Sequence, residues 1–246
     1  PMLIYGLNPV LEALRAGRVR RLRIAARGDR RMDEVVAMAK AAGVTVERVD
    51  AQALERLTGG AVHQGIAADL SPMPGYSVEE LVEGAAPGAP LLVVLDGVED
   101  PHNVGAIARS VDAAGAHGII RQARHAAALE GAAAKASAGA TAFVRFATVV
   151  NIARALEDLA AAGVWTVGFA GEANDAYDEV DYTLPTAIVV GGEGEGLRRL
   201  TKERCDRLVR IPMAGGVSSL NVSVAAGVAL FEAARQRRAA RDREPR

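Results

Sequence analysis

The sequence predicts an α/β protein with a small amino-terminal domain and a larger carboxy-terminal domain built on a parallel sheet. From residue 91 onward, short continuous apolar strands alternate with helical patterns, which is typical of a parallel sheet covered on both faces. Before them, a stretch of about seventy residues forms its own series of strands and helices, within the size range of small domains. Two breaks rich in proline and glycine, at residues 71–75 and 84–90, separate the two series.

The amino-terminal series begins with Asn8 and Pro9, a cap residue followed by proline, which predicts a helix that ends at Gly17. The residues before Asn8 are expected to lead straight into this helix. The remaining elements are expected as strands at 22–26, 44–49 and 65–70 and helices at 32–42 and 51–57. The acidic stretch between the two breaks predicts a linker with one helical turn. The expected organisation is therefore an amino-terminal domain at 1–71, a linker at 72–90 and a second domain at 91–246.

In the second domain, strands are expected at 91–95, 118–120, 164–169, 187–190 and 208–211. The helices are expected at 104–114, 152–162, 197–203 and 221–238. Ligands of such sheets bind beyond the carboxyl ends of the strands. Three unusual loops of this sequence lie at those ends.

Composition excludes several classes of protein. Hydrophobic residues make up 50% of the chain and aromatic residues only 4%, so the core is expected to consist mainly of Ala, Val, Leu and Ile. The longest apolar runs are too short to cross a bilayer, and no secretory signal segment is recognised. The single cysteine excludes an internal disulfide, and the four histidines form no metal-ligand pattern, so no metal is expected. We expect a cytoplasmic protein that does not associate with membranes.

A net charge of −1 conceals two arginine clusters. The first comprises Arg15, Arg18, Arg20, Arg21, Arg23, Arg27, Arg30 and Arg31, and the second Arg235, Arg237, Arg238, Arg241, Arg243 and Arg246. Arginine suits bidentate contact with phosphate. Charge alone favours nucleic-acid binding and a merely solvated surface equally.

The first unusual loop follows the strand at 91–95 and contains Asn103, with Arg109 six residues later. Asn103 is a good helix cap, and exposed arginines on helices are common. By itself this segment favours a structural explanation.

The second loop, at residues 191–197, holds four glycines and two glutamates. Its glycine spacing differs from the G-x-G-x-x-G register of dinucleotide-binding proteins, and it lies late in the chain. Glu193 and Glu195 would also repel a pyrophosphate. A cationic or zwitterionic ligand therefore fits this loop better. The structural alternative, a glycine-rich tight turn, explains one or two glycines but not four glycines with two glutamates.

The third loop runs from Ile211 to Ala226, through two glycines into the last helix. One capping residue would suffice at a helix start. Here Ser218, Ser219, Asn221 and Ser223 crowd the same corner. The surplus of hydroxyl, amide and backbone groups could therefore face a ligand.

In this order at three strand ends, the loops resemble the three signature motifs of the SpoU (TrmH-like) ribose 2′-O-methyltransferases of the SPOUT class. Residues 4–13 and 62–67 resemble the RNA-binding domain of the ribosomal RNA branch of this family. The match is looser at 120–129 and better at 135–140. The resemblance implies a homodimer with a carboxy-terminal trefoil knot, whereas general topology rules alone favour an unknotted sheet. It also implies S-adenosylmethionine as cofactor and a guanosine ribose of large-subunit rRNA as substrate.

The resemblance assigns a role to eight residues. It implies cofactor contacts at Gly191, Ile211 and Leu220. It makes Arg109 the catalytic arginine and places Asn103, Glu193, Ser219 and Asn221 around it. A guanidinium is essentially never deprotonated in proteins, so our hypothesis is that Arg109 binds the neighbouring phosphate and stabilises the developing alkoxide, while another group takes the proton.

Two alternatives stay open at this point. One is a non-catalytic RNA-binding assembly factor that keeps the fold, although the intact loops argue against it. The other is the same reaction on another RNA, either transfer RNA or a ribosomal adenosine linked to antibiotic resistance. The presence of the amino-terminal domain favours ribosomal RNA over transfer RNA.

Overall fold

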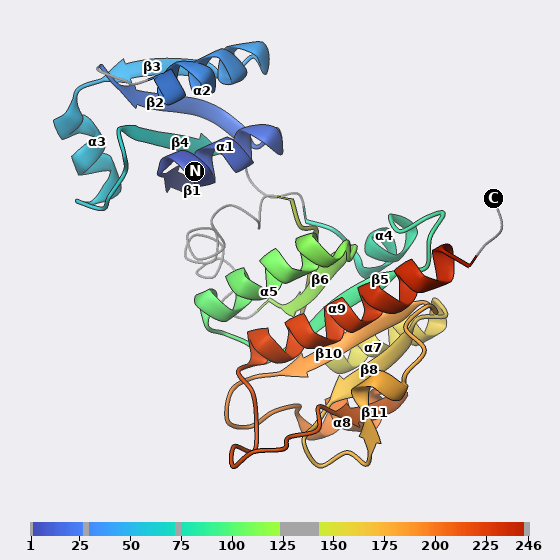
Figure 1. Ribbon diagram of the computed structural model, residues 1–246. Helices are drawn as coiled ribbons and strands as arrows, with labels where there is room; N and C mark the ends of the chain where they lie inside the picture. The colour runs from blue at the N-terminus through green and yellow to red at the C-terminus, as the bar shows by residue number, and fades with distance from the viewer. Residues whose placement is uncertain (1, 27–29, 72–74, 124–142, 244–246) are drawn as a thin grey trace. The chain divides into compact units, whose positions relative to one another are not determined.

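A computed structural model describes residues 2–26, 30–71, 75–123 and 143–243 of the chain. The segment at 135–140 and most of the segment at 120–129 lie outside these ranges. The chain divides into two compact units, and the described residues 2–71 and 75–243 fall almost entirely into the first and the second (Figure 1). Each unit is described by itself.

The first unit is a four-stranded mixed sheet in the order β1-β4-β2-β3. β4 runs antiparallel to both β1 and β2, and β2 runs parallel to β3. The strands are β1 (Met2–Tyr5), β2 (Val19–Ala25), β3 (Thr45–Val49) and β4 (Ile66–Leu70), and the helices are α1 (Leu7–Arg15), α2 (Arg30–Ala41) and α3 (Ala51–Thr58). The small core is aliphatic, as the composition predicts.

The start of α1 differs from the prediction. Its cap position is Gly6, at φ 94°, and the Leu7 N–H donates to Oε1 of Gln64 at 2.9 Å. Asn8 is therefore not the cap, and Pro9 lies in the first turn, where a missing N–H costs no helical hydrogen bond. The residues before it form β1, which the sequence pattern did not predict because its pairing with β4 is non-local.

The second unit is a seven-stranded sheet in the order β7-β6-β5-β10-β8-β11-β9, and all the strand pairs within its described part are parallel. Its strands are β5 (Leu91–Asp96), β6 (Gly118–Gln122), β7 (Phe146–Val149), β8 (Trp165–Phe169), β9 (Asp175–Ala176), β10 (Thr186–Gly191) and β11 (Arg207–Arg210). The predicted parallel sheet is confirmed. The short strands β7 and β9 were not predicted.

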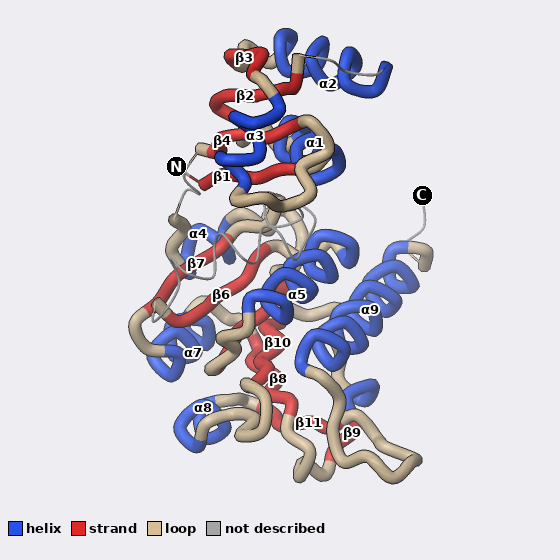
Figure 2. The backbone as a smooth tube through the Cα atoms, turned by 90° about the vertical axis from the view of Figure 1, so that its left-hand side faces the viewer, coloured by secondary structure: helices blue, strands red, loops and turns tan. Residues whose placement is uncertain are grey.

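Helices cover both faces of this sheet. Figure 2 shows α5 (Pro101–Ala114) and α9 (Val222–Arg241) on one face and α4 (Val78–Glu83), α7 (Ile152–Ala161) and α8 (Arg199–Arg204) on the other. The helical turn expected between the two proline-rich breaks is α4, which a capping box of Ser77 and Glu80 opens. Val78 and Leu81 of α4 are buried in the core shared with α7, so this turn packs into the second unit.

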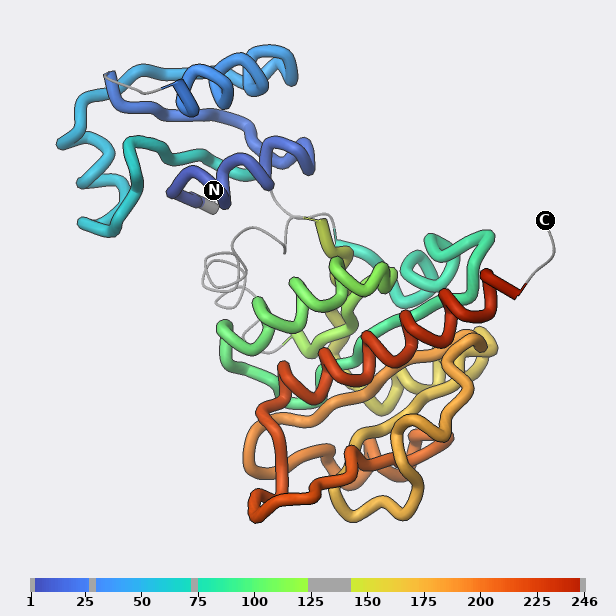
Figure 3. The backbone as a smooth tube through the Cα atoms, in the orientation of Figure 1, coloured from blue at the N-terminus to red at the C-terminus, as the bar shows by residue number. Residues whose placement is uncertain are grey.

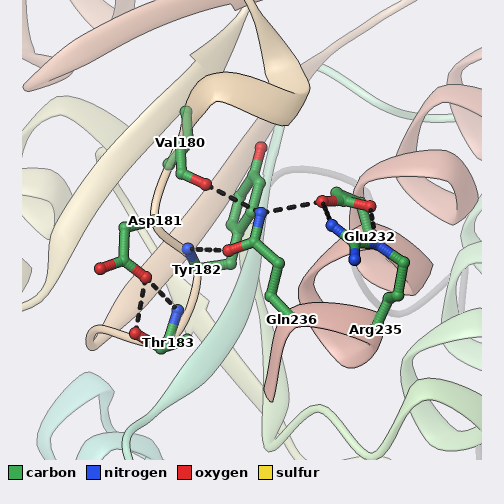
Figure 4. A network of polar contacts seen from close by, with 7 residues as sticks. All are labelled: Val180, Asp181, Tyr182, Thr183, Glu232, Arg235 and Gln236. Atoms are coloured by element: carbon green, nitrogen blue, oxygen red, sulfur yellow. Dashed lines mark hydrogen bonds and ion pairs between the residues drawn. The ribbon is translucent and has the colours of Figure 1, made fainter. Parts of the chain in front are cut away.

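The carboxy-terminal half of α9 is fastened to the loop before β10 (Figure 4). Gln236 Oε1 accepts from the Tyr182 N–H at 2.9 Å, and its Nε2 donates to the Val180 carbonyl at 3.0 Å. Arg237 donates to four backbone carbonyls, those of Ala89, Pro90, Tyr182 and Leu184, at 2.6–3.0 Å. These bonds fix the carboxy-terminal half of α9. The amino-terminal end of α9 follows the third loop (Figure 3). Within the described ranges, none of the helices is long and apolar enough to cross a membrane.

Candidate functional site

The three loops meet at the carboxyl edge of the second sheet. β5 and β10 are neighbours in this sheet, and their last residues, Asp96 and Gly191, pair in register. The first loop leaves β5 toward α5, and the second leaves β10 toward α8. The third loop leaves β11 and enters α9, which packs against α5. Parallel strand order therefore brings together segments more than one hundred residues apart.

Three polar side chains, one from each loop, form a closed cluster at this meeting point. Asn103 Nδ2 donates to Glu193 Oε1 at 2.8 Å. Asn221 Nδ2 donates to Asn103 Oδ1 at 3.0 Å and to Glu193 Oε1 at 3.1 Å. Asn221 Oδ1 also accepts from the N–H of Ser223, so of the four polar residues at this corner Asn221 is the cap of α9, and it still reaches the other two loops. We call these three residues the polar cluster.

Asn103 is not the cap of α5. That cap is Asp100, whose carboxylate accepts from the His102 N–H at 3.0 Å. Asn103 lies inside the first turn and is only 6% exposed, so its amide is available for bonds across the loops. The structural explanation of Asn103 as a cap is therefore wrong, because Asp100 occupies the position three residues earlier.

The loop at 191–197 folds back tightly on itself. The Gly196 N–H donates to the Gly192 carbonyl at 3.0 Å, and the Gly192 N–H donates to the Asp96 carbonyl at 2.9 Å. A Cβ atom on Gly191 would lie 2.0 Å from the carbonyl carbon of Gly196. Gly194 and Gly196 adopt positive φ angles of 82° and 65°, which favour glycine. A Cβ on Gly192 would lie 2.4 Å from the Gly97 carbonyl oxygen, so all four glycines of the loop have a geometric reason.

A cavity of about 340 Å³ opens beside this loop, at the carboxyl ends of β8, β10 and β11. Its lining includes Gly191, Glu193, Ile211, Ser219 and Leu220. Of the eight candidate residues, five therefore line one cavity. Asn103 and Asn221 lie in the polar cluster, which shares Glu193 with the cavity.

Arg109 lies apart from the cavity lining. It projects from α5, less than two turns after Asn103, and is exposed. It makes no hydrogen bond or ion pair with any other residue of the described ranges. The guanidinium is thus accessible to a substrate from solvent.

Sequence reasoning missed three charged residues of the cavity, Glu172, Lys202 and Arg210. Glu172 follows β8 and forms an ion pair with Lys202 of α8, and both line the cavity. The hydrogen bond from Lys202 lowers the pKa of the Glu172 carboxyl below its ordinary value. Neither residue lies in the three loops, so only the packing of α8 beside β8 reveals the pair. In the described part of the chain, no group of three or more His, Cys, Asp or Glu could hold a metal ion.

Two family models match the sequence. One describes the SpoU rRNA Methylase family and matches residues 90–231. The other describes RNA 2′-O ribose methyltransferase substrate binding and matches residues 3–74. The first range contains all three loops, and the second contains the whole of the four-stranded sheet except part of β1.

Curated relatives match over nearly the whole chain. A protein named 23S rRNA (guanosine-2′-O-)-methyltransferase RlmB from Pseudomonas syringae pv. tomato is 47% identical over 244 residues, 97% of each chain. A protein of the same name from Yersinia pestis is 45% identical, covering 96% of this chain and 97% of its own. An uncharacterized tRNA/rRNA methyltransferase of Mycobacterium avium is 43% identical, covering 96% of this chain and 77% of its own.

Solved structures show the same fold. The SpoU methyltransferase AviRb from Streptomyces viridochromogenes, in complex with the cofactor AdoMet, superposes with a TM-score of 0.81 at 26% identity, covering 96% of this chain and 90% of its own. The AdoMet-bound rRNA methyltransferase from Sinorhizobium meliloti has a TM-score of 0.79 at 28% identity, with coverage of 95% and 87%.

Proposed function

The chain belongs to the SpoU rRNA methylase family, and on that premise we propose that it transfers a methyl group from S-adenosylmethionine to a ribose 2′-hydroxyl of a guanosine in 23S rRNA. The observation that carries the proposal is the polar cluster, which joins the three family loops beside the cavity. The choice of guanosine rests on relatives of that printed name, which match over nearly their full length.

The residues around the cavity suit S-adenosylmethionine. Gly191, Ile211 and Leu220 would hold it, largely through backbone groups. Gly191 has no room for a side chain, and its backbone lines the cavity. Glu193 and Glu195 line the same cavity and carry the negative charge that a positively charged sulfonium favours. When bound, S-adenosylmethionine supplies an electrophilic methyl group.

Arg109 is suited to hold the RNA at the reaction centre. Its guanidinium is exposed and, within the described ranges, unpaired, so it is available to bind a phosphate and stabilise charge on the 2′-oxygen. It cannot accept the hydroxyl proton at neutral pH, so another acceptor, such as a phosphate oxygen or water, takes that proton. Ser219 lines the cavity two residues before Asn221, the cap of α9.

Replacing Arg109 by lysine tests this role. Arg109→Lys keeps the positive charge but loses the two-pronged donor geometry, so the single-turnover rate of methyl transfer should fall by about tenfold or more. Arg154→Lys is the control, because Arg154 is an exposed helical arginine on α7 whose side chain, among the described residues, pairs only with Asp158 of the same helix. An unchanged rate for Arg109→Lys would exclude an essential guanidinium.

We propose that residues 1–71 form an RNA substrate-binding domain, joined through residues 72–90 to the methyltransferase domain at 91–246. The substrate-binding family model supports the first assignment. Within this unit, Arg15, Arg20, Arg21, Arg30 and Arg31 are exposed and suited to phosphate contact. Arg23 is not free for that purpose, because it pairs with Asp69 at 2.8 Å. An rRNA substrate also implies a cytoplasmic location, where ribosomes assemble.

We further propose the homodimer and the trefoil knot that are expected of this family. Four exposed apolar side chains support the dimer: Val217 and Leu220 in the loop before α9, and Val224 and Phe231 on α9 itself. Val224 and Phe231 are seven residues apart on α9 and so share one face. Leu220 also lines the cavity, so a partner that covers Leu220 would lie beside the cofactor. Phe231→Glu should yield monomers in light scattering, whereas Trp165→Glu, on exposed residue Trp165 of β8, should leave the dimer intact.

The activity itself is tested with the purified chain, S-adenosylmethionine labelled in its methyl group, and unmodified 23S rRNA. We expect label in a single guanosine, and none in transfer RNA offered as a competitor. Absence of transfer to 23S rRNA, together with absent cofactor binding in calorimetry, would overturn the enzyme assignment. Binding of RNA without cofactor would instead favour an assembly factor.

A further inference from the structure

The loop at 191–197 is held at both of its ends by one residue, Asp96. At the start of the loop, the Gly192 N–H donates to the backbone carbonyl of Asp96 at 2.9 Å. At its end, the Arg198 N–H donates to Oδ2 of Asp96 at 2.8 Å. One residue at the end of β5 therefore closes the loop that lines the cavity and carries Glu193.

The side chain of Asp96 is completely buried, and its charge is compensated by Arg198. Its exposed fraction is 0%, and its Oδ1 lies 3.7 Å from Nε of Arg198. Oδ1 has no hydrogen-bond partner in the described part of the chain. Burying a carboxylate costs far more than burying an amide, and an amide oxygen could also accept one N–H. The negative charge therefore points to a second task, the retention of the Arg198 guanidinium.

Arg198 in turn covers the segment that supports the loop. Its Nη1 donates to Gln122 Oε1 of β6 at 2.9 Å. A Cβ on Gly97 would lie 3.3 Å from Nη2 of Arg198, and a Cβ on Gly192 would lie 2.4 Å from the Gly97 carbonyl oxygen. The backbone at 96–97 is thus packed between Gly192, at the start of the loop, and the side chain of Arg198, directly after the loop. We call this arrangement the clasp. Movement of this clasp would shift Glu193 and the cavity wall together.

We propose that Asp96 is a positioning residue for cofactor binding: it fixes the loop at 191–197 in the shape that receives S-adenosylmethionine. The proposal rests on the proposed function. Asp96 does not line this cavity and acts only through the loop and Arg198. The same clasp keeps Glu193 in reach of Asn103 and Asn221.

The test compares Asp96→Ala and Asp96→Asn in the full chain. Asp96→Ala removes the acceptor and the charge, so the Kd for S-adenosylmethionine in calorimetry should rise about tenfold or more. Asp96→Asn can still accept from the Arg198 N–H, so its Kd should rise by a smaller factor, about threefold. Arg198→Ala should add little to Asp96→Asn, because both changes break the same ion pair.

A second readout needs no cofactor. Amide hydrogen exchange at residues 191–198 should be faster in both Asp96 variants than in the parent chain. The control is Asp206→Asn, because Asp206 also accepts a backbone N–H, that of Thr166 at 2.8 Å, but at the opposite edge of the same sheet. Asp206→Asn should lower the melting temperature and leave both the Kd and exchange at 191–198 unchanged.

If Asp96→Ala does not fold, Asp96→Asn decides the question by the same two readouts. Folded Asp96 variants with the parental Kd and parental exchange would overturn the inference while leaving the proposed function intact. A parent chain that binds no S-adenosylmethionine would overturn the proposed function, and the inference with it.

Discussion

Asn103 connects the first loop to both of the others through the two ends of one amide. Its nitrogen donates to Glu193 and its oxygen accepts from Asn221. A carboxylate at this position could accept but could not donate. The cluster therefore depends on an amide, and not merely on a polar residue.

Replacing Asn103 by aspartate should disable the site. Asn103→Asp would put a carboxylate where a donor now faces Oε1 of Glu193 at 2.8 Å, inside a buried position. We expect the free energy of unfolding to fall by about 1–3 kcal/mol and methyl transfer to fall by more than about tenfold. Denaturant titration and a single-turnover assay measure the two effects.

The matched control is Asn151→Asp. Asn151 caps α7, and within the described ranges only its side-chain oxygen is used, as the acceptor from the Arg154 N–H at 3.2 Å. Aspartate caps a helix as well as asparagine does, so this variant should retain stability and activity. Equal losses in the two variants would contradict the role given to the polar cluster.

Gly191→Ala should abolish cofactor binding, because the new methyl group would collide with the backbone of Gly196 and open the loop. Gly75→Ala is the control outside the cavity, since a Cβ there meets open space. Calorimetry with S-adenosylmethionine should therefore show no binding for the first variant and near-parental binding for the second. Parental affinity in Gly191→Ala would show that the loop can yield.

At the scale of residues, the sequence indicated the members of the site better than their tasks. The excess of polar groups near Asn221 was informative, because Asn221 both caps α9 and reaches Asn103. Only the interpretation of Asn103 as a helix cap was wrong, since capping preferences are local and Asp100 satisfies them equally well. Asp96 gave no signal, because its importance depends on a contact with Arg198, 102 residues away.

At the scale of elements, α9 is fastened at both ends, by Asn221 at the site and by Arg237 far from it. Arg237 binds carbonyls of residues 89–90 and 182–184, and burial lowers the pKa of its guanidinium relative to the ordinary value. The bonds join α9 to the starts of β5 and β10. The helix is thereby held in one register against the strands whose far ends form the site.

Arg237→Ala should lower the free energy of unfolding by about 2–3 kcal/mol, because several partly buried carbonyls lose a charged donor. Arg235→Ala is the control: Arg235 is exposed and, in the part of the chain that the structure describes, pairs only with Glu232 on the same helix, so the melting temperature should not change. Thermal unfolding followed by circular dichroism compares the two. Identical melting curves would contradict the fastening.

His117 gives the second unit a pH dependence. Its Nδ1 accepts from the Leu91 N–H at 2.9 Å, and burial, with the charge of Arg237, lowers its pKa from the ordinary 6.5. A depressed pKa in the folded state contributes stability above pH 6.5, and this stability is lost as the pH falls through the folded value. Protonation also removes the acceptor.

The parent chain should therefore lose more stability than His117→Gln between about pH 7.5 and about pH 5. Denaturant titrations at the two pH values provide the comparison, because glutamine can accept the Leu91 N–H but does not titrate. A stability difference between the two proteins that is independent of pH would contradict this assignment.

Most elements of the second unit could be predicted because a buried parallel strand is a continuous apolar run, as in β5. β1, β7 and β9 escaped prediction, although β11, which also has only four residues, was predicted. Their pairing partners, and not their own sequences, make them strands. The order of strands in either sheet is equally a property of long-range packing.

At the scale of the whole molecule, RNA binding by the first unit and methyl transfer by the second predict that RNA affinity depends strongly on salt. Aromatic residues are scarce and exposed arginines are frequent in the first unit, so RNA should be bound mainly through phosphates. Affinity for an rRNA fragment should fall by at least about tenfold between about 50 and 200 mM salt, as measured by filter binding. Arg20→Ala should reduce the slope, and a flat response of the parent chain would contradict phosphate-based binding.

The α/β class, the parallel sheet and the family were accessible from the sequence, because the three loops follow strands in a recognisable order. The boundary between the two domains was harder to predict. The sequence pattern at 72–90 predicts a linker, yet Val78 and Leu81 of α4 are buried in the second unit. A knot leaves no local pattern at all. It depends on the path of the chain, for which sequence periodicity carries no information.

The central claim is ribose 2′-O-methylation of one guanosine in 23S rRNA. Its most direct test is to map 2′-O-methyl groups on rRNA from cells lacking this protein, and again after the parent chain or Arg109→Lys is restored. We expect one guanosine to lose its methyl group, to regain it with the parent chain and to remain largely unmethylated with the variant. An unchanged methylation map, or a lost mark on another RNA, would contradict the account.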